Sequence, residues 1–147
     1  MTDIKQLCNT IRELSYSIHS YLRFGHLEKV YENALIHRLQ KQGISCESQY
    51  PLHVMDEDGT VLGNFYADLF VDNRLIVEIK ACKSLLDEHF AQILGYLRAS
   101  RIEHGLIVNF GAPKLQIKKF IMNNGSSDRV PVSFVNSVPF CGNKETC

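Results

Sequence analysis

The N-terminal part of the chain places its apolar side chains at helical spacing. Between residues 3 and 22 these positions are Ile4, Leu7, Ile11, Leu14, Ile18 and Leu22, which is close to a heptad repeat. From about residue 27 to residue 42, one side of a second helix is formed by Leu27, Tyr31, Ala34, Leu35 and Leu39. Phe24-Gly25 ends the first pattern and Gly43 ends the second, so two consecutive amphipathic helices are predicted.

The spacing then changes to the alternation that is typical of β-strands. Residues 44–54 and 60–71 are predicted strands, joined by a turn with the sequence Asp-Glu-Asp-Gly at residues 56–59. A third strand is predicted over residues 74–81, which read RLIVEIKA. These segments predict a run of three strands in the middle of the chain.

Helical spacing returns after the third strand. Residues 84–100 predict a helix with Ser84 as a candidate N-cap, and the almost wholly apolar residues 104–110 predict a strand covered on both faces. Residues 114–122 predict a last helix. The order α-α-β-β-β-α-β-α favours an α/β (α+β) fold, a small mixed sheet flanked by helices, in a single domain of residues 1–122.

The last part of the chain, residues 123–147, has a different composition. It begins with the linker-like sequence NNGSSDR and continues with β-branched residues interrupted by Pro131 and Pro139. We expect either a loosely attached tail or an edge strand.

Composition limits the class of protein. With 147 residues, 45% of them hydrophobic and 22% charged, the chain is typical of a globular domain, and it has no apolar run long enough to span a membrane. The polar N-terminus does not resemble a signal peptide, and five scattered cysteines favour reduced thiols in a cytoplasmic protein. A net charge of zero argues against tight, sequence-independent duplex binding, so any nucleic-acid contact has to be local.

The buried third strand contains two charged residues, Glu78 and Lys80. A three-residue loop, Asp72-Asn73-Arg74, would place Val71 opposite Leu75, Asp68 opposite Glu78 and Tyr66 opposite Lys80. A two-residue loop would instead place the two carboxylates on opposite faces. Asn73 tolerates the left-handed conformation that the longer loop needs, so we expect that register. The opposite face would then be apolar throughout: Ala67, Leu69, Val71, Leu75, Val77, Ile79 and Ala81.

Two opposed carboxylates raise each other's pKa unless a positive charge lies between them. Lys80 could supply it in a partly buried ion pair, which would make the cluster purely structural. A hard divalent cation such as Mg²⁺ accepts carboxylate oxygens and completes its octahedron with water. The second helix adds Glu28 and Glu32, four residues apart on one face. Glu28 could instead complement the helix dipole, and Glu32 occupies a position where an apolar residue is expected.

These residues carry a resemblance to a known group of enzymes. The sequence EIK, which follows the ADL strand, resembles the D…(D/E)xK signature of the PD-(D/E)XK nuclease superfamily. The sequence GHLEKVYE, with Gly25, Glu28 and Tyr31, resembles the motif of the GxxExxY protein family. Further fitting segments are ADLFV, IVEIKA, HFAQILGYLRA and GLIVNFGAP, so the resemblance covers about residues 24–120. The proline of the superfamily name is replaced by Ala67.

The resemblance implies a nuclease-like core and a site that cleaves phosphodiester bonds with Mg²⁺ or Mn²⁺. Asp68, Glu78 and the main-chain carbonyl of Ile79 would bind the metal. Lys80 would orient or activate the attacking water. Glu32, preferred to Glu28, would complete the acidic set. Gln92 and Tyr96 match supporting residues of related nucleases, although a polar helix face and a core aromatic residue would explain them equally well.

Two functions therefore remain open at the level of sequence. The first is a metal-dependent nuclease acting on DNA or RNA. The second is a catalytically silent binding or regulatory module with the same fold. A homodimer or a partner protein is also conceivable, because the heptad-like first helix or the apolar tail could serve as a docking surface.

Overall fold

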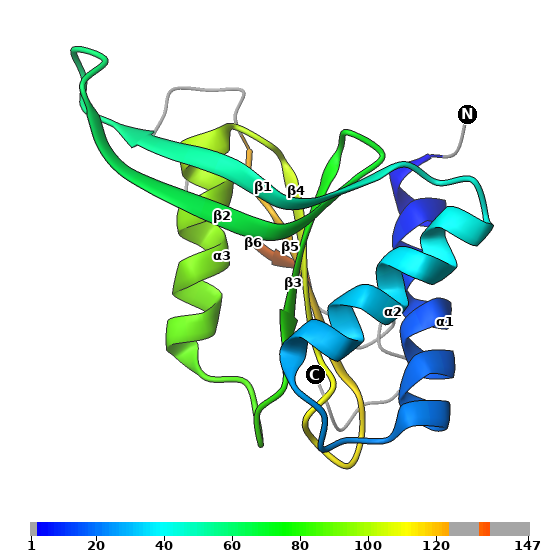
Figure 1. Cartoon of the computed structure of the whole chain (residues 1–147). Coiled ribbons are helices and arrows are strands. Elements are labelled where there is room, and N and C mark those ends of the chain that lie inside the picture. Colours follow the sequence, from blue (N-terminus) through cyan, green and yellow to red (C-terminus); the bar gives the residue numbers. More distant parts are fainter. Residues whose placement is uncertain (1–2, 124–132, 136–147) are drawn as a thin grey trace.

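The computed structural model describes residues 3–123 and 133–135, with three helices and six strands (Figure 1). The elements are α1 (Ile4–Leu22), α2 (Glu28–Lys41), β1 (Cys46–Met55), β2 (Val61–Val71), β3 (Leu75–Lys80), α3 (Asp87–Ser100), β4 (His104–Asn109), β5 (Gln116–Ile121) and β6 (Ser133–Val135). None of the described helices is both long and apolar enough to cross a membrane.

The strands form a single mixed sheet in the order β1-β2-β3-β4-β5-β6. β3 and β4 are parallel and are connected through α3, whereas the other neighbouring strands are antiparallel. α1 and α2 lie together on one side of the sheet, and α3 lies on the other side (Figure 1). The predicted fold class, a small mixed sheet flanked by helices, is confirmed.

The prediction of a last helix over residues 114–122 is wrong, because this segment forms β5. Ile117 packs on the α1 and α2 side of the sheet and Phe120 on the α3 side, as alternation in a strand requires. The spacing of Ile117, Phe120 and Ile121 also fits one helical turn, and a short apolar run does not distinguish the two. The free edge of β4 decides the outcome, because it pairs with β5 from His104–Ile121 to Asn109–Gln116.

The expectation of a loosely attached tail or an edge strand concerns residues 123–147. Most of them, residues 124–132 and 136–147, lie outside the described residues. Within the tail, β6 pairs with β5 as the last strand of the sheet.

The predicted register of the hairpin between β2 and β3 is confirmed. Val71 pairs with Leu75, Phe70 with Ile76 and Leu69 with Val77. Asp72 and Asn73 both have positive φ angles, 53° and 56°, which supply the left-handed residues of the loop. The regular pairing of β2 with β3 ends at Leu69–Val77, so the expected pairs of Asp68 with Glu78 and of Tyr66 with Lys80 are not part of it.

Beyond this point β2 leaves β3 and continues with β1 as a long two-stranded arm, which Figure 1 shows extending past α3. At this point a kink interrupts the pairing of β1 with β2. Gln49 of β1 has a φ angle of 54° and forms no regular pair with Asp68 of β2. On one side of this kink Leu69 packs against α1 and α2, and on the other side Ala67 packs against α3. The expectation that Ala67 shares one apolar face with Leu69 is therefore wrong, because the kink turns β2 over between them.

The connection between α1 and α2 is fastened by Tyr31. Its hydroxyl donates to the main-chain oxygen of Arg23 and accepts from the amide of His26, and its ring stacks on Phe110 with 4.6 Å between centroids. Gly25 lies inside this loop with a φ angle of 119°, which an L-residue rarely adopts. Gly25 and Tyr31 thus fix the point at which α2 begins.

We expect Tyr31→Phe to lower the free energy of unfolding by about 1–2 kcal/mol, because the amide of His26 loses its acceptor and the main-chain oxygen of Arg23 loses its donor while the ring stack is kept. Urea unfolding followed by circular dichroism measures the change. Tyr21→Phe is the matched control, since Tyr21 is 79% exposed, whereas Tyr31 is fully buried. Equal stability of the Tyr31→Phe and wild-type proteins would contradict this account of the loop.

Candidate functional site

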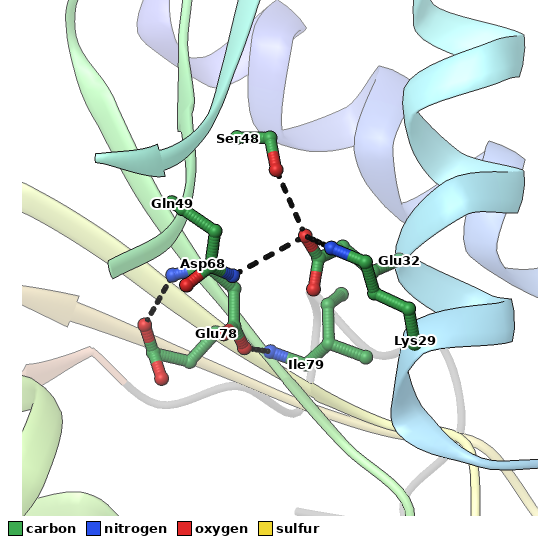
Figure 2. Close-up of polar contacts among 7 residues, drawn as sticks. All are labelled: Lys29, Glu32, Ser48, Gln49, Asp68, Glu78 and Ile79. Atoms are coloured by element: carbon green, nitrogen blue, oxygen red, sulfur yellow. Dashed lines mark hydrogen bonds and ion pairs between the residues drawn. The ribbon is translucent and has the colours of Figure 1, made fainter. Parts of the chain in front are cut away.

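Asp68 and Glu78 occupy the position at which β2 separates from β3, and each carboxylate binds the main chain of the opposite strand. The amide of Asp68 donates to Oε2 of Glu78 at 2.9 Å, and the amide of Ile79 donates to Oδ2 of Asp68 at 2.8 Å. Figure 2 shows both contacts. The structure therefore brings together the two acids that the sequence predicted to lie opposite each other.

Burial makes the negative charges of this pair unfavourable. Glu78 is 3% exposed, and desolvation together with the charge of Asp68 raises its pKa to about 8. Desolvation also raises the pKa of Asp68, with further contributions from the charges of Glu32 and Glu28. Lys80 lowers both pKa values by less than burial raises them. The site therefore has a deficit of positive charge.

Lys80 does not form the ion pair that would make the cluster purely structural. Among the ion pairs of the described residues, none joins Lys80 to Asp68 or to Glu78. Its Nζ donates instead to Oε1 of Gln92 at 2.8 Å, and Nε2 of Gln92 donates to the hydroxyl of Tyr96 at 3.2 Å. Gln92 and Tyr96, four residues apart on α3, thus form a polar chain that ends at the lysine.

Glu32 lies on α2 beside Asp68, and Figure 2 draws Asp68 between Glu32 and Glu78. It is only 4% exposed. Its Oε2 accepts from Lys29 at 3.1 Å, from Ser48 at 3.1 Å and from Gln49 at 3.4 Å. These contacts fix Glu32 against β1 at the kink, and none of the three donors was predicted from the sequence.

Glu28 has a different environment from Glu32. It is the first residue of α2 and is exposed. Its charge nevertheless raises the pKa of both Asp68 and Glu78, so it faces the same region. The two helical acids therefore divide into a buried one held by hydrogen bonds and an exposed one at the start of the helix.

Asn109 was also missed, although it organises the loop that follows Lys80. Its Oδ1 accepts from the amides of Cys82 and Gly111, and its Nδ2 donates to the oxygen of Cys82 and to Gln116. A methyl group at Gly111 would lie 2.3 Å from the main-chain nitrogen of Cys82, so the two loops meet only because Gly111 has no side chain. The only sequence feature that could have indicated this role is the position of an asparagine at the end of an almost wholly apolar strand.

Ser84 does not cap α3. The helix begins at Asp87, and the amide of Leu86 donates to Nδ1 of His89 at 3.0 Å. The residues from Cys82 to Leu86 form a loop instead, which the hydrogen bond from the amide of Leu85 to Gln116 holds against β5.

The donor atoms at this site fit a hard divalent cation. Mg²⁺ commonly takes one or two protein carboxylates and completes its shell with water. Asp68 and Glu78 each use one oxygen to bind an amide, and in the described part of the chain neither carboxylate forms an ion pair with a cationic side chain. The same residues contain no ready-made group of three histidine, cysteine or acidic side chains around one point. A cation here would depend on these two carboxylates, main-chain oxygen and water.

Comparison with known proteins identifies the family. A sequence model of the PD-(D/E)XK nuclease superfamily matches residues 5–120. The chain is also similar to a solved structure titled "Crystal structure of SSO0001", with a TM-score of 0.52 and 20% sequence identity over 62% of this chain and 48% of that one. The chain spans about half the length of that structure, and at this identity the likeness shows the fold alone. No curated protein matches the sequence.

The raised pKa of Glu78 predicts a dependence of stability on pH. Between its ordinary value of 4.5 and its folded value of about 8, the folded protein binds more protons than the unfolded chain. Without divalent metal, stability should therefore fall as the pH rises through this range, by more than about 1 kcal/mol. Glu78→Gln should remove much of the fall and should be more stable than the wild type above pH 8.

Urea unfolding across this range in EDTA measures the effect. Glu57→Gln, at the exposed turn between β1 and β2, is the matched control and should retain the wild-type dependence. A wild-type protein whose stability does not change with pH, or a Glu78→Gln protein that is less stable than wild type at high pH, would contradict the burial of an uncompensated charge.

Proposed function

Because the chain belongs to the PD-(D/E)XK nuclease superfamily, we propose that it is a nuclease that hydrolyses phosphodiester bonds of nucleic acid with the help of Mg²⁺ or Mn²⁺. The observation that carries the proposal is the pair formed by the buried Glu78 and the half-buried Asp68, which no described cationic side chain neutralises by direct contact. A purely structural role would favour neutral residues at this place, because an unpaired buried charge costs stability. Binding of a divalent cation explains why both acids are present.

The carboxylates of Asp68 and Glu78 and the main-chain carbonyl of Ile79 would hold the cation. When bound, it would lower the pKa of a water molecule and stabilise the negative charge that develops on the phosphate. The amide contacts of Asp68 and Glu78 keep both carboxylates in place. This matters because small displacements of catalytic groups are costly in rate.

Lys80 would act on the attacking water and on the phosphate. Its ammonium group lies on the same strand as Glu78, two residues further on, and is directed by its hydrogen bond to Gln92. Tyr96 in turn holds the amide of Gln92. Gln92 and Tyr96 are therefore positioning residues in the proposal, and Lys80 is the catalytic one.

The two helical acids take separate roles in this proposal. Glu32, whose Oε2 already accepts three hydrogen bonds, holds α2 against the kink of β1 and adds negative charge next to Asp68. Glu28, exposed at the start of α2, is free to bind water of the cation's hydration shell. This reverses the preference for Glu32 over Glu28 as the acid at the cation, because the hydrogen bonds of Glu32 were not visible in the sequence.

Asp68→Asn and Glu78→Gln are expected to weaken Mg²⁺ and Mn²⁺ binding by at least about tenfold, since even the loss of groups that only support metal ligands has an effect of this size. Both variants should also abolish cleavage of labelled single- and double-stranded DNA and RNA. Titration calorimetry measures the first effect and gel electrophoresis of the labelled strands measures the second. Glu57→Gln removes the same charge at an exposed turn away from the site, so this variant should resemble the wild type.

Metal binding that both variants weaken, together with metal-dependent cleavage that both abolish, would establish the proposal. A wild-type protein that binds neither Mg²⁺ nor Mn²⁺ would contradict it, and would favour the catalytically silent binding module of the same fold.

Lys80→Met should reduce the rate of cleavage by about 10²–10⁴-fold without weakening metal binding, because the lysine acts on the water and not as a ligand. Single-turnover cleavage and titration calorimetry on the same preparation separate the two effects. Lys83→Met, at an exposed position three residues further on, should leave both unchanged. Weaker metal binding in Lys80→Met would assign the lysine a structural role instead.

A further inference from the structure

The arm formed by β1 and β2 presents an aromatic ring next to the proposed site. Phe65 lies on β2 and is 45% exposed, although it faces the same side as the buried Leu52 with which it pairs. Its ring covers Gly63, two residues earlier on the same face, where a methyl group would lie 3.0 Å from Cε2 of Phe65. The absence of a side chain at Gly63 therefore lets the ring lie against the strand with part of its surface open to solvent.

The ring of Phe65 is connected to Lys80 by a continuous series of contacts. Its centroid lies 6.2 Å from that of Tyr96. The Tyr96 hydroxyl accepts from Gln92, and Gln92 accepts from Lys80. Burial raises the pKa of Tyr96, and the charges of Glu78 and Asp68 raise it further, so this residue is close enough to the acid pair to sense both charges. A group stacked on Phe65 would therefore be a near neighbour of the reacting phosphate.

The charge of the protein favours stacking over phosphate contacts as the source of affinity. The chain has 16 basic and 16 acidic residues, so the release of counterions cannot supply much binding energy for a duplex. The turn at the end of the arm carries Asp56, Glu57 and Asp58, all exposed, which would repel the phosphates of a second strand. Stacking of an unpaired base on an aromatic ring requires no basic surface and tolerates any sequence.

We propose that Phe65 is a stacking platform for an unpaired base next to the cleaved bond, so that the substrate is a single strand or an unpaired segment of nucleic acid. The inference rests on the proposed nuclease function and specifies its substrate class. Phe65 takes no part in the chemical step. It positions the strand while Lys80 and the acids act on the phosphate.

Binding tests the inference separately from cleavage. Fluorescence anisotropy in EDTA, and again with Ca²⁺, would compare a labelled oligothymidine strand, an oligouridine strand and a mixed-sequence duplex. We expect the wild type to bind single strands more tightly than the duplex, and Phe65→Ala to weaken single-strand binding by about tenfold. Phe65→Trp should retain this binding. Phe65→Leu keeps an apolar side chain on the arm and should still lose the affinity, which excludes a simple folding defect.

Leu62→Ala provides the matched control, because Leu62 is an apolar residue of the same strand, 62% exposed and three positions before Phe65. A fluorescent adenine analogue within the strand would report stacking directly, and its quenching by the wild type should disappear with Phe65→Leu but not with Leu62→Ala. Undetectable single-strand binding, equal binding of duplex and single strand, or unchanged affinity and quenching in Phe65→Leu would overturn the inference.

The two proposals fail in different ways. Cleavage of duplex and single strand at equal rates, unaffected by Phe65→Leu, would leave the nuclease function standing and overturn the role of Phe65. Strand binding that depends on Phe65, without cleavage in Mg²⁺ or Mn²⁺, would support the platform and contradict the nuclease function.

Discussion

The structure around the site depends on the exchange of hydrogen bonds between β2 and β3 at Asp68 and Glu78. Side-chain carboxylates accept the amide protons of Asp68 and Ile79 at the point where the regular pairing of the two strands ends. β2 can therefore leave β3 without leaving these amides unpaired, and it continues with β1 as the arm. The same exchange holds two carboxyl groups, Glu78 buried and Asp68 half-buried, with no cationic side chain of the described residues in contact with them. One local arrangement thus determines both the point at which β2 separates from β3 and the lack of a paired positive charge at the two acids.

Much of this arrangement could be predicted from the sequence because it depends on local rules. The apolar periodicity located α1, α2 and most of α3, and the Asp72-Asn73-Arg74 loop set the hairpin register next to which Asp68 and Glu78 meet. The resemblance to related nucleases pointed to Gln92 and Tyr96. In the structure Gln92 accepts a hydrogen bond from Lys80 and donates one to Tyr96. Their catalytic contribution is still a prediction.

The remaining features depend on contacts between distant segments, which local patterns do not encode. β5 is a strand because it pairs with the edge of β4, and Gln49 at the kink donates a hydrogen bond to Glu32 on the distant helix α2. The role of Asn109 required knowledge that β4 ends beside the loop after Lys80. The motif with Gly25, Glu28 and Tyr31 shows the same limit. Its sequence does not reveal that Gly25 and Tyr31 close a loop whereas Glu28 faces the acids.

The parts of the site also differ in the length of chain that must close to form them. Asp68 and Glu78 are ten residues apart and meet within one hairpin, whereas Asn109 reaches Cys82 across 27 residues and requires the crossover through α3. Closing a short loop costs less chain entropy and is faster than forming a parallel pair. Loop-closure entropy therefore favours formation of the hairpin that holds the two acids before the crossover through α3 is complete, while water still solvates both carboxylates. In that order of events, the desolvation that raises their pKa values follows the formation of the hairpin, as the rest of the fold packs around it.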